Sequence, residues 1–245
     1  MKGVAEGVQT ERQGEDYGGS LLERIARDFG MRAVVVEARE EGGDLQRAAF
    51  TGDPGGSRVL RASCGNIELT LREEPAETGA DLILTARRHS SGRLDRFSVF
   101  LEIPAESLPG FWLHPLPFRV GLDGRERTVA VDHAPPFEDF AEGWILENGQ
   151  RGLLVMRVPD GSHETCFVPV EIAVPNGEKV IRPGIAGADG QDHRTRSLFV
   201  RRLENGESVQ FPPLRLASFP GGWEKGVALF RSTLSGRLTR LREPR

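Results

Sequence analysis

The sequence has little of several features that mark common classes of protein. Of its 245 residues only 7% are aromatic and only two are cysteines, and no stretch approaches the roughly 18 uninterrupted apolar residues of a membrane-spanning helix. A chain of this length buries a core that needs no disulfide. We therefore expect no membrane partner, and we expect Cys64 and Cys166 to be free, buried thiols, although the sequence leaves their pairing open.

An excess of charge of one sign is missing as well. The chain has 32 Lys and Arg residues against 36 Asp and Glu residues, a formal net charge of -4, and the two signs are mixed along the sequence. Such a chain has no basic face for nucleic acid, so we expect no nucleic-acid partner. The first thirty residues contain no apolar stretch after a basic start, which predicts a cytoplasmic protein without an export signal.

Signature motifs of several catalytic classes are also absent. The sequence contains no Gly-x-Ser-x-Gly, His-Glu-x-x-His, Cys-x-x-Cys or Gly-x-x-x-x-Gly-Lys motif. The glycine-rich segment 184–193 lacks the spacing of a calcium loop, and we predict a hairpin loop there. Five histidines lie in or near predicted turns, and none is at metal-ligand spacing from another: His89, His114, His133, His163 and His193. We therefore expect no metal and no cofactor, and we assign no catalytic residue.

What the sequence does contain is a regular pattern of short strands. Runs rich in Val, Ile, Leu and Phe occur at residues 33–38, 45–51, 58–63, 66–71, 81–86 and 97–103. Apolar and polar residues alternate strictly over 67–72, which predicts a sheet buried on one side. Asn-Gly or Asp-Gly pairs suited to type I′ hairpins begin at residues 123, 148, 160, 176, 189 and 205. The predicted fold class is all-β, an antiparallel β-sandwich.

A short helix is predicted on each side of the strands. Ser20 is suited to cap a helix that buries Leu21, Leu22, Ile25 and Phe29 and ends at Gly30. A second helix follows residues 220–222 and should end at Gly236. Its apolar face, which we expect to pack on the sandwich or on a partner, consists of Trp223, Val227, Phe230 and Leu234. The predicted organisation is a flexible tail over 1–19, one sandwich domain over 20–235, and a basic tail or linker over 236–245.

The few aromatic side chains gather in two segments, 111–118 and 136–144. Both segments place broad rings beside polar groups, a combination that suits a sugar, whose CH face lies on a ring while its hydroxyls meet carboxylates or amides. The candidate carbohydrate-binding residues are Trp112, His114, Phe137, Glu138, Asp139 and Trp144. The alternative is that the two tryptophans fill the core between the sheets.

Several stretches resemble a known family. Residues 81–92, followed by 97–104, are similar to a strand, a turn and a strand with a closing proline in galactose-mutarotase-like supersandwich domains. The segments 203–208, 213–216 and 222–231 resemble the end of such a domain in α-galactosidase-like glycoside hydrolases. In those enzymes the sandwich precedes the catalytic barrel, shapes one rim of the substrate cleft and mediates oligomer contacts. This chain lacks the barrel, so no catalytic residue carries over.

The resemblance implies a non-catalytic, carbohydrate-associated module or subunit of a glycosidase-like system. Its partners would be a carbohydrate ligand, a catalytic barrel domain or subunit, or a second copy of the chain. Two alternatives stay open. A stand-alone mutarotase-like sugar epimerase would need a histidine facing a carboxylate, and a structural or assembly sandwich would have no ligand. The sequence does not identify the sugar.

Overall fold

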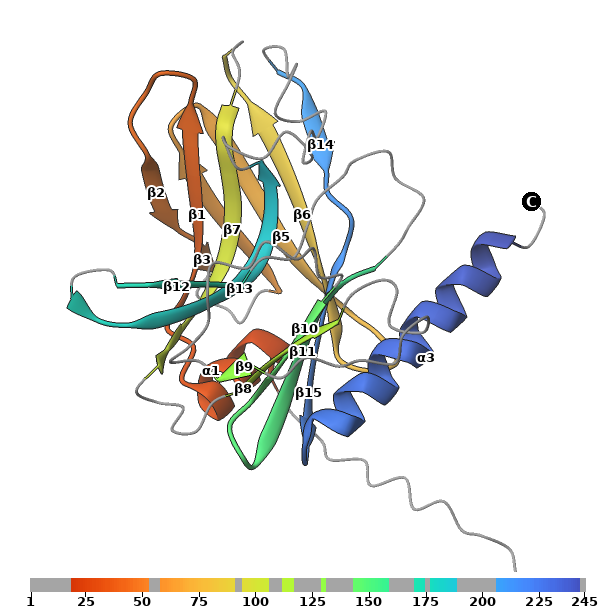
Figure 1. Ribbon diagram of the computed structural model, residues 1–245. Helices are drawn as coiled ribbons and strands as arrows, with labels where there is room; N and C mark the ends of the chain where they lie inside the picture. The colour runs from red at the N-terminus through yellow and green to blue at the C-terminus, as the bar shows by residue number, and fades with distance from the viewer. Residues whose placement is uncertain are drawn as a thin grey trace, which may run out of the picture.

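The computed structural model of the chain contains two antiparallel sheets and a helix near each end of the described chain (Figure 1). The structure describes residues 19–52, 58–90, 94–105, 112–116, 129–130, 143–158, 170–174, 177–188 and 206–242. The predicted all-β, sandwich-like class is confirmed, because the described strands all pair antiparallel and both helices begin where the sequence predicts them. Within these residues neither helix combines the length and the apolar composition needed to cross a bilayer.

The first sheet has five strands, contributed by both halves of the chain. Across the sheet they are β12 (Val170–Ala173), β13 (Val180–Ala188), β7 (Leu94–Pro104), β1 (Ala33–Glu40) and β2 (Gln46–Ala49). Among the described strands, β12 and β2 therefore lie at its two edges. The prediction of a loop over 184–193 is wrong for its first part, because β13 continues to Ala188, while residues 189–193 lie outside the described part of the chain.

The second sheet has ten strands and joins the two halves of the chain through a single late strand. Its path is β3 (Thr51–Gly52), β4 (Val59–Cys64), β5 (Ile67–Pro75), β6 (Ala80–Arg88), β15 (Leu214–Pro220), β11 (Arg151–Arg157), β10 (Gly143–Glu147), β8 (Trp112–Leu116) and β9 (Val129–Ala130). The short strand β14 (Ser208–Gln210) pairs with β6 beside β15. β15 thus lies between strands that come from distant parts of the sequence.

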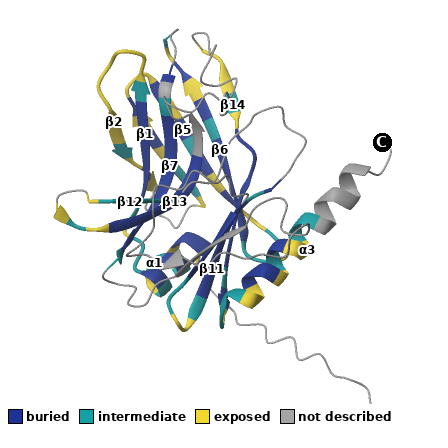
Figure 2. Ribbon diagram, in the orientation of Figure 1, coloured by how far each residue is buried: buried dark blue, intermediate teal, exposed yellow. Residues whose placement is uncertain are grey.

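The main core lies between the two sheets (Figure 2), and the buried residues of β5 follow the period of two that the sequence predicts. On β5, Ile67, Leu69 and Leu71 are buried, whereas Glu68 is exposed. Rings from distant parts of the chain also meet in this core, for example those of Phe97 and Phe211, which are stacked with centroids 5.3 Å apart. The strict alternation seen in the sequence therefore orients β5 with one face to the core.

Helix α1 (Leu21–Phe29) is fixed to the sandwich at its first turn. Ser20 and Glu23 form a reciprocal capping box, and Gly30 ends the helix in the left-handed conformation with φ of 67°. The backbone N–H groups of Leu21 and Leu22 donate to the two carboxylate oxygens of Glu73 on β5, at 2.7 and 3.3 Å. Glu73 is buried, so it both caps the helix and holds it on the sheet.

Replacing Glu73 with alanine should lower the free energy of unfolding by about 1–3 kcal/mol, because two buried N–H groups lose their acceptor. Urea denaturation of the variant beside the wild type measures the change. Glu74→Ala is the matched control, since that neighbouring side chain is 49% exposed and pairs only at the surface with Arg72. Equal losses in the two variants would show that Glu73 does not fix the helix.

Helix α3 (Trp223–Arg242) packs on the outer side of the second sheet, over β10, β11 and β15 (Figure 1). Val227 and Phe230 are buried there, whereas Trp223 and Leu234 are half-buried. Gly226 lets the helix approach closely, because a Cβ atom at that position would lie 2.6 Å from Cδ1 of Ile145. The apolar face of the helix therefore contacts the chain's own sheet.

The prediction that this helix ends at Gly236 is wrong, because it continues to Arg242. A glycine inside a helix costs only about 1 kcal/mol relative to alanine, and the arginine and leucine residues that follow are good helix formers. The segment predicted as a basic tail thus begins as helix.

Candidate functional site

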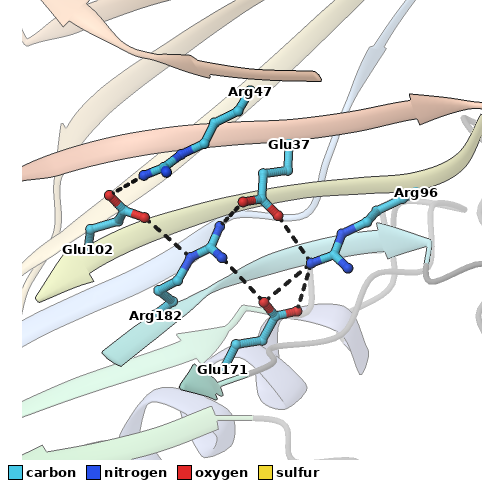
Figure 3. A network of polar contacts seen from close by, with 6 residues as sticks. All are labelled: Glu37, Arg47, Arg96, Glu102, Glu171 and Arg182. Carbon is cyan, nitrogen blue, oxygen red and sulfur yellow. Dashed lines mark hydrogen bonds and ion pairs between the residues drawn. The ribbon is translucent and has the colours of Figure 1, made fainter. Parts of the chain in front are cut away.

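Six charged side chains form a network on the five-stranded sheet (Figure 3). Every strand of the sheet contributes at least one of them, and we call the set the charged network: Glu37 on β1, Arg47 on β2, Arg96 and Glu102 on β7, Glu171 on β12, and Arg182 on β13. On β7 the alternate residues Phe97, Val99 and Leu101 belong to the main core. Since side chains alternate between the faces of a strand, the charged network lies on the sheet face that points away from that core.

Arg182 is at the centre of the charged network. Its Nη2 donates to Oε1 of Glu37, its Nε lies 3.4 Å from Oε1 of Glu102, and its Nη1 lies 3.6 Å from Oε2 of Glu171. The guanidinium also lies over the ring of Phe100, 4.3 Å from the ring centroid, in a cation–π contact. One cation therefore joins carboxylates from three other strands.

Two further arginines complete the charged network. Nη2 of Arg96 donates to Oε2 of Glu37 at 3.1 Å and to both oxygens of Glu171 at 3.2 and 3.3 Å. Nη2 of Arg47 donates to Oε2 of Glu102 at 2.5 Å. Arg96, Glu37, Arg182 and Glu171 thereby close a ring of alternating charge, and Arg47 extends it towards the β2 edge.

Burial decreases from the centre of the charged network to its rim. The side chains of Arg182 and Glu37 are each 6% exposed, whereas those of Glu171 and Arg47 are 34% and 38% exposed. Charges so deeply buried persist only when they are paired, as these are. The arrangement therefore presents a partly accessible rim that is supported by a rigid, desolvated centre.

Three buried atoms of the charged network have no hydrogen-bond partner. Nε of Arg96, Nε of Arg182 and Oε1 of Glu102 are buried and have no hydrogen-bond partner, the last two facing each other at an ion-pair distance only. Buried polar atoms without a partner are uncommon in folded proteins, and each calls for a physical explanation. Because the three atoms are shielded from solvent, they belong to the interior of the charged network, and a molecule at its surface does not reach them.

The charged network is chemically balanced, with three guanidinium groups and three carboxylates. Neighbouring planar groups of this kind donate and accept hydrogen bonds side by side, which suits hydroxyl groups. Within the described residues no group of three His, Cys, Asp or Glu side chains is placed to hold a metal ion.

The aromatic candidates from the sequence lie in the other sheet or outside the described residues. Trp144 on β10 is 1% exposed, so its ring packs in the main core. Trp112 and His114 lie on the neighbouring strand β8, where they are opposite Glu147 and Ile145 in the backbone register. Three candidates fall outside the described part of the chain: Phe137, Glu138 and Asp139. Their proposed role in carbohydrate binding stays a prediction.

The epimerase alternative requires a histidine beside a carboxylate, and the structure contains such a pair in His89 and Glu68. Nε2 of His89 lies 2.9 Å from Oε2 of Glu68, and the two side chains are 43% and 58% exposed. Proton transfer in enzymes benefits from a site that excludes water, and this pair is on an open surface. His133, His163 and His193 lie outside the described residues.

Cys64 is buried and free, as predicted, while Cys166 lies outside the described residues. Burial raises the pKa of the Cys64 thiol, the nearby Glu37 carboxylate raises it further, and a backbone hydrogen bond from Ala38 lowers it. The thiol is therefore protonated at neutral pH and is not an activated nucleophile.

None of the six residues of the charged network was a candidate on the sequence alone. A usable signal was present, because Glu37, Glu102 and Arg182 each interrupt an apolar run: Val-Val-Val-Glu-Ala, Phe-Leu-Glu-Ile and Val-Ile-Arg-Pro. A charge within a strand that is otherwise apolar indicates either a wet face or a buried ion pair. The partners of that charge depend on which strands are neighbours in the sheet.

The chain thus combines an antiparallel β-sandwich with a charge-balanced face on its five-stranded sheet. Comparison with known proteins adds no relative, since no family model, no curated protein and no solved structure matches the chain.

Proposed function

We propose that the protein is a non-catalytic, carbohydrate-binding β-sandwich module, and that the charged network is its binding face. The observation that carries the proposal is a partly exposed rim in which carboxylates and guanidinium groups lie side by side, with Arg47 38% and Glu171 34% exposed. This proposal agrees with the resemblance to the sandwich domains of glycoside hydrolases. Association with a catalytic barrel domain or subunit is part of the same proposal.

A sugar suits this face because each hydroxyl group can donate one hydrogen bond and accept others. Adjacent hydroxyls on a pyranose ring can bridge a carboxylate and a guanidinium, as at Arg96 and Glu171. Both groups are attached to strands, so their positions are fixed before the ligand arrives, and little conformational entropy is lost on binding.

The same contacts argue against hydrolysis at this face. Glycoside hydrolysis uses one carboxylic acid as a proton donor and a second carboxylate as a nucleophile or base. In the charged network Glu37, Glu102 and Glu171 are each engaged by at least one arginine. They are arranged to bind and not to exchange protons with a leaving group.

Binding of the purified chain to an array of immobilised oligosaccharides tests the proposal. We expect the wild type to bind. Arg96→Gln should weaken binding about tenfold, because a hydrogen bond to a charged group is worth about 1.5–3 kcal/mol, and 1.4 kcal/mol corresponds to a roughly tenfold change in affinity. Arg72→Gln is the control, because Arg72 is exposed on the other sheet and its loss changes the net charge equally. Unchanged binding in Arg96→Gln would place the site elsewhere, and no binding by the wild type would favour a structural module.

A further inference from the structure

We propose that helix α1 is a strap that couples the two halves of the second sheet, so that releasing either end of the helix loosens the other end and the contact between the halves. The first half consists of β3, β4, β5 and β6, and the second half consists of β15, β11, β10, β8 and β9. This coupling is independent of carbohydrate binding, because no residue of the charged network takes part in it.

The two halves meet over a short stretch of β15, residues 214–216, which we call the junction. β15 pairs with β11 along its whole length, Leu214–Pro220, but it pairs with β6 only at the junction. The buried ion pair between Arg215 and Asp81 also lies there. Since local stability depends on how many contacts must break together, a junction of three residue pairs is a point at which the sheet can open.

Helix α1 has the length needed to cross the junction. Its nine residues rise about 13 Å, at ~1.5 Å per residue. β6 and β15 lie between β5 and β11 in the strand order, and three strand spacings of about 4.8 Å make a separation of about 14 Å. The first turn of the helix is bound by Glu73 on β5, which belongs to the first half.

The last turn of α1 is bound to the second half through Asp28. Its Oδ2 lies 3.1 Å from Nε of Arg151 on β11 and 3.5 Å from Oγ of Ser218 on β15. Nδ2 of Asn148, in the hairpin between β10 and β11, donates to the backbone carbonyl of Asp28 at 3.3 Å. Each end of the helix is therefore tied by polar contacts to a different half of the sheet.

Asp28 is placed against the preference of the helix itself. A carboxylate in the last turn is unfavourable, because the C-terminal end of a helix carries a partial negative charge. The side chain is also only 14% exposed, so it has lost much of its contact with water. Its partners Arg151 and Ser218 offset both costs, which indicates that Asp28 serves the contact between helix and sheet.

The two ends of α1 are coupled because the helix is a short, rigid element. Opening the junction moves the halves apart, so it must also break the contact of Glu73 or that of Asp28 with its partners. Releasing one end in advance removes this resistance. Coupling between two sites is reciprocal, so each end should respond to the loss of the other.

Hydrogen exchange of individual backbone amides in the full chain, followed by NMR, tests the coupling. Asp28→Ala removes the side-chain contacts of the last turn, and alanine has the highest helix propensity, so any loosening does not come from a weaker helix. We expect exchange about tenfold faster at the amides of Leu21 and Leu22, at the far end of the helix, and at the junction.

The reverse variant should show the same coupling from the other side. Glu73→Ala releases the first turn, and exchange should become about tenfold faster at the amides of Asn148 and Arg151, which are hydrogen-bonded within the hairpin. An effect in one direction only would contradict the proposal.

Arg27→Ala is the matched control, because this side chain lies beside Asp28 on the same helix, is 63% exposed and pairs with that neighbour. It should leave exchange at Leu21, Leu22 and the junction unchanged. If Asp28→Ala speeds exchange only around its own partners on β11 and β15, or nowhere, the proposal is overturned and α1 only packs on the core.

Urea denaturation gives a second measurement. In the double variant Glu73→Ala with Asp28→Ala, the shift of the midpoint should be smaller than the sum of the two single shifts, since the first change already releases the strap. A shift equal to the sum would show that the two ends act independently, and it would also overturn the proposal. If Asp28→Ala does not fold, Arg151→Gln removes the same ion pair from the sheet, where that side chain is 32% exposed, and takes its place in both experiments.

Discussion

Replacing Arg182 with methionine is expected to lower the free energy of unfolding by about 3–5 kcal/mol, measured by urea denaturation. The physical reason is that Glu37 and Glu102 remain in place, each with little access to water, after their shared cation is lost. Among the described residues, Glu37 then keeps only Arg96 and Glu102 keeps only Arg47, and these more exposed arginines offset part of the desolvation of the two carboxylates but not all of it. Arg72→Met on the exposed side of β5 is the control and should change stability by less than about 0.5 kcal/mol.

A second replacement distinguishes this explanation from a loss of packing over Phe100. Arg182→Met combined with Glu37→Met removes one charge of each sign, and the remaining four charges are again balanced. The double variant should be more stable than Arg182→Met alone, since well-packed apolar groups can replace a buried ion pair at little cost. A double variant that loses the sum of the two single losses would show no coupling between the two side chains and would contradict this explanation.

Replacing Phe230 with alanine should cost about 3–5 kcal/mol, because its ring is buried between α3 and the second sheet. Trp223→Ala should cost clearly less, although tryptophan is the larger side chain, since Trp223 is only half-buried at the start of the helix. Thermal and urea denaturation of both variants measure the difference. A larger loss in Trp223→Ala would contradict the packing described for this helix.

The parts of the fold that depend on local pattern could be predicted from the sequence. The strict alternation in β5 and the capping residues of α1 are local features, and both appear in the structure where the sequence places them. Strand β13 could not be predicted from the sequence, because it contains Pro183 and Gly184, and proline and glycine are unfavourable within strands. Gly184 has a structural reason, since a Cβ atom there would lie 2.0 Å from the carbonyl oxygen of Val99 on β7.

The charged network could not be predicted because its contacts join distant parts of the chain. Arg182 and Glu37 are 145 residues apart, and they meet only because β13 and β1 both pair with β7. The apolar runs around Glu37 and Arg182 indicate that each charge lies within a strand, but they do not indicate which opposite charge it meets. The order of strands in the sheet, which a single sequence does not specify, turns these charges into one site.

The position of β15 in the second sheet has a consequence for how the protein is made. β15 pairs with β6 on one side and with β11 on the other, so both strands lack this neighbour until the ribosome has released residues 214–220. Arg215 and Asp81, which form an ion pair across β15 and β6, are 134 residues apart, and closing a loop of that size is slow. During synthesis the half-built sheet therefore exposes two strand edges that can pair with other chains until the late strand closes the gap.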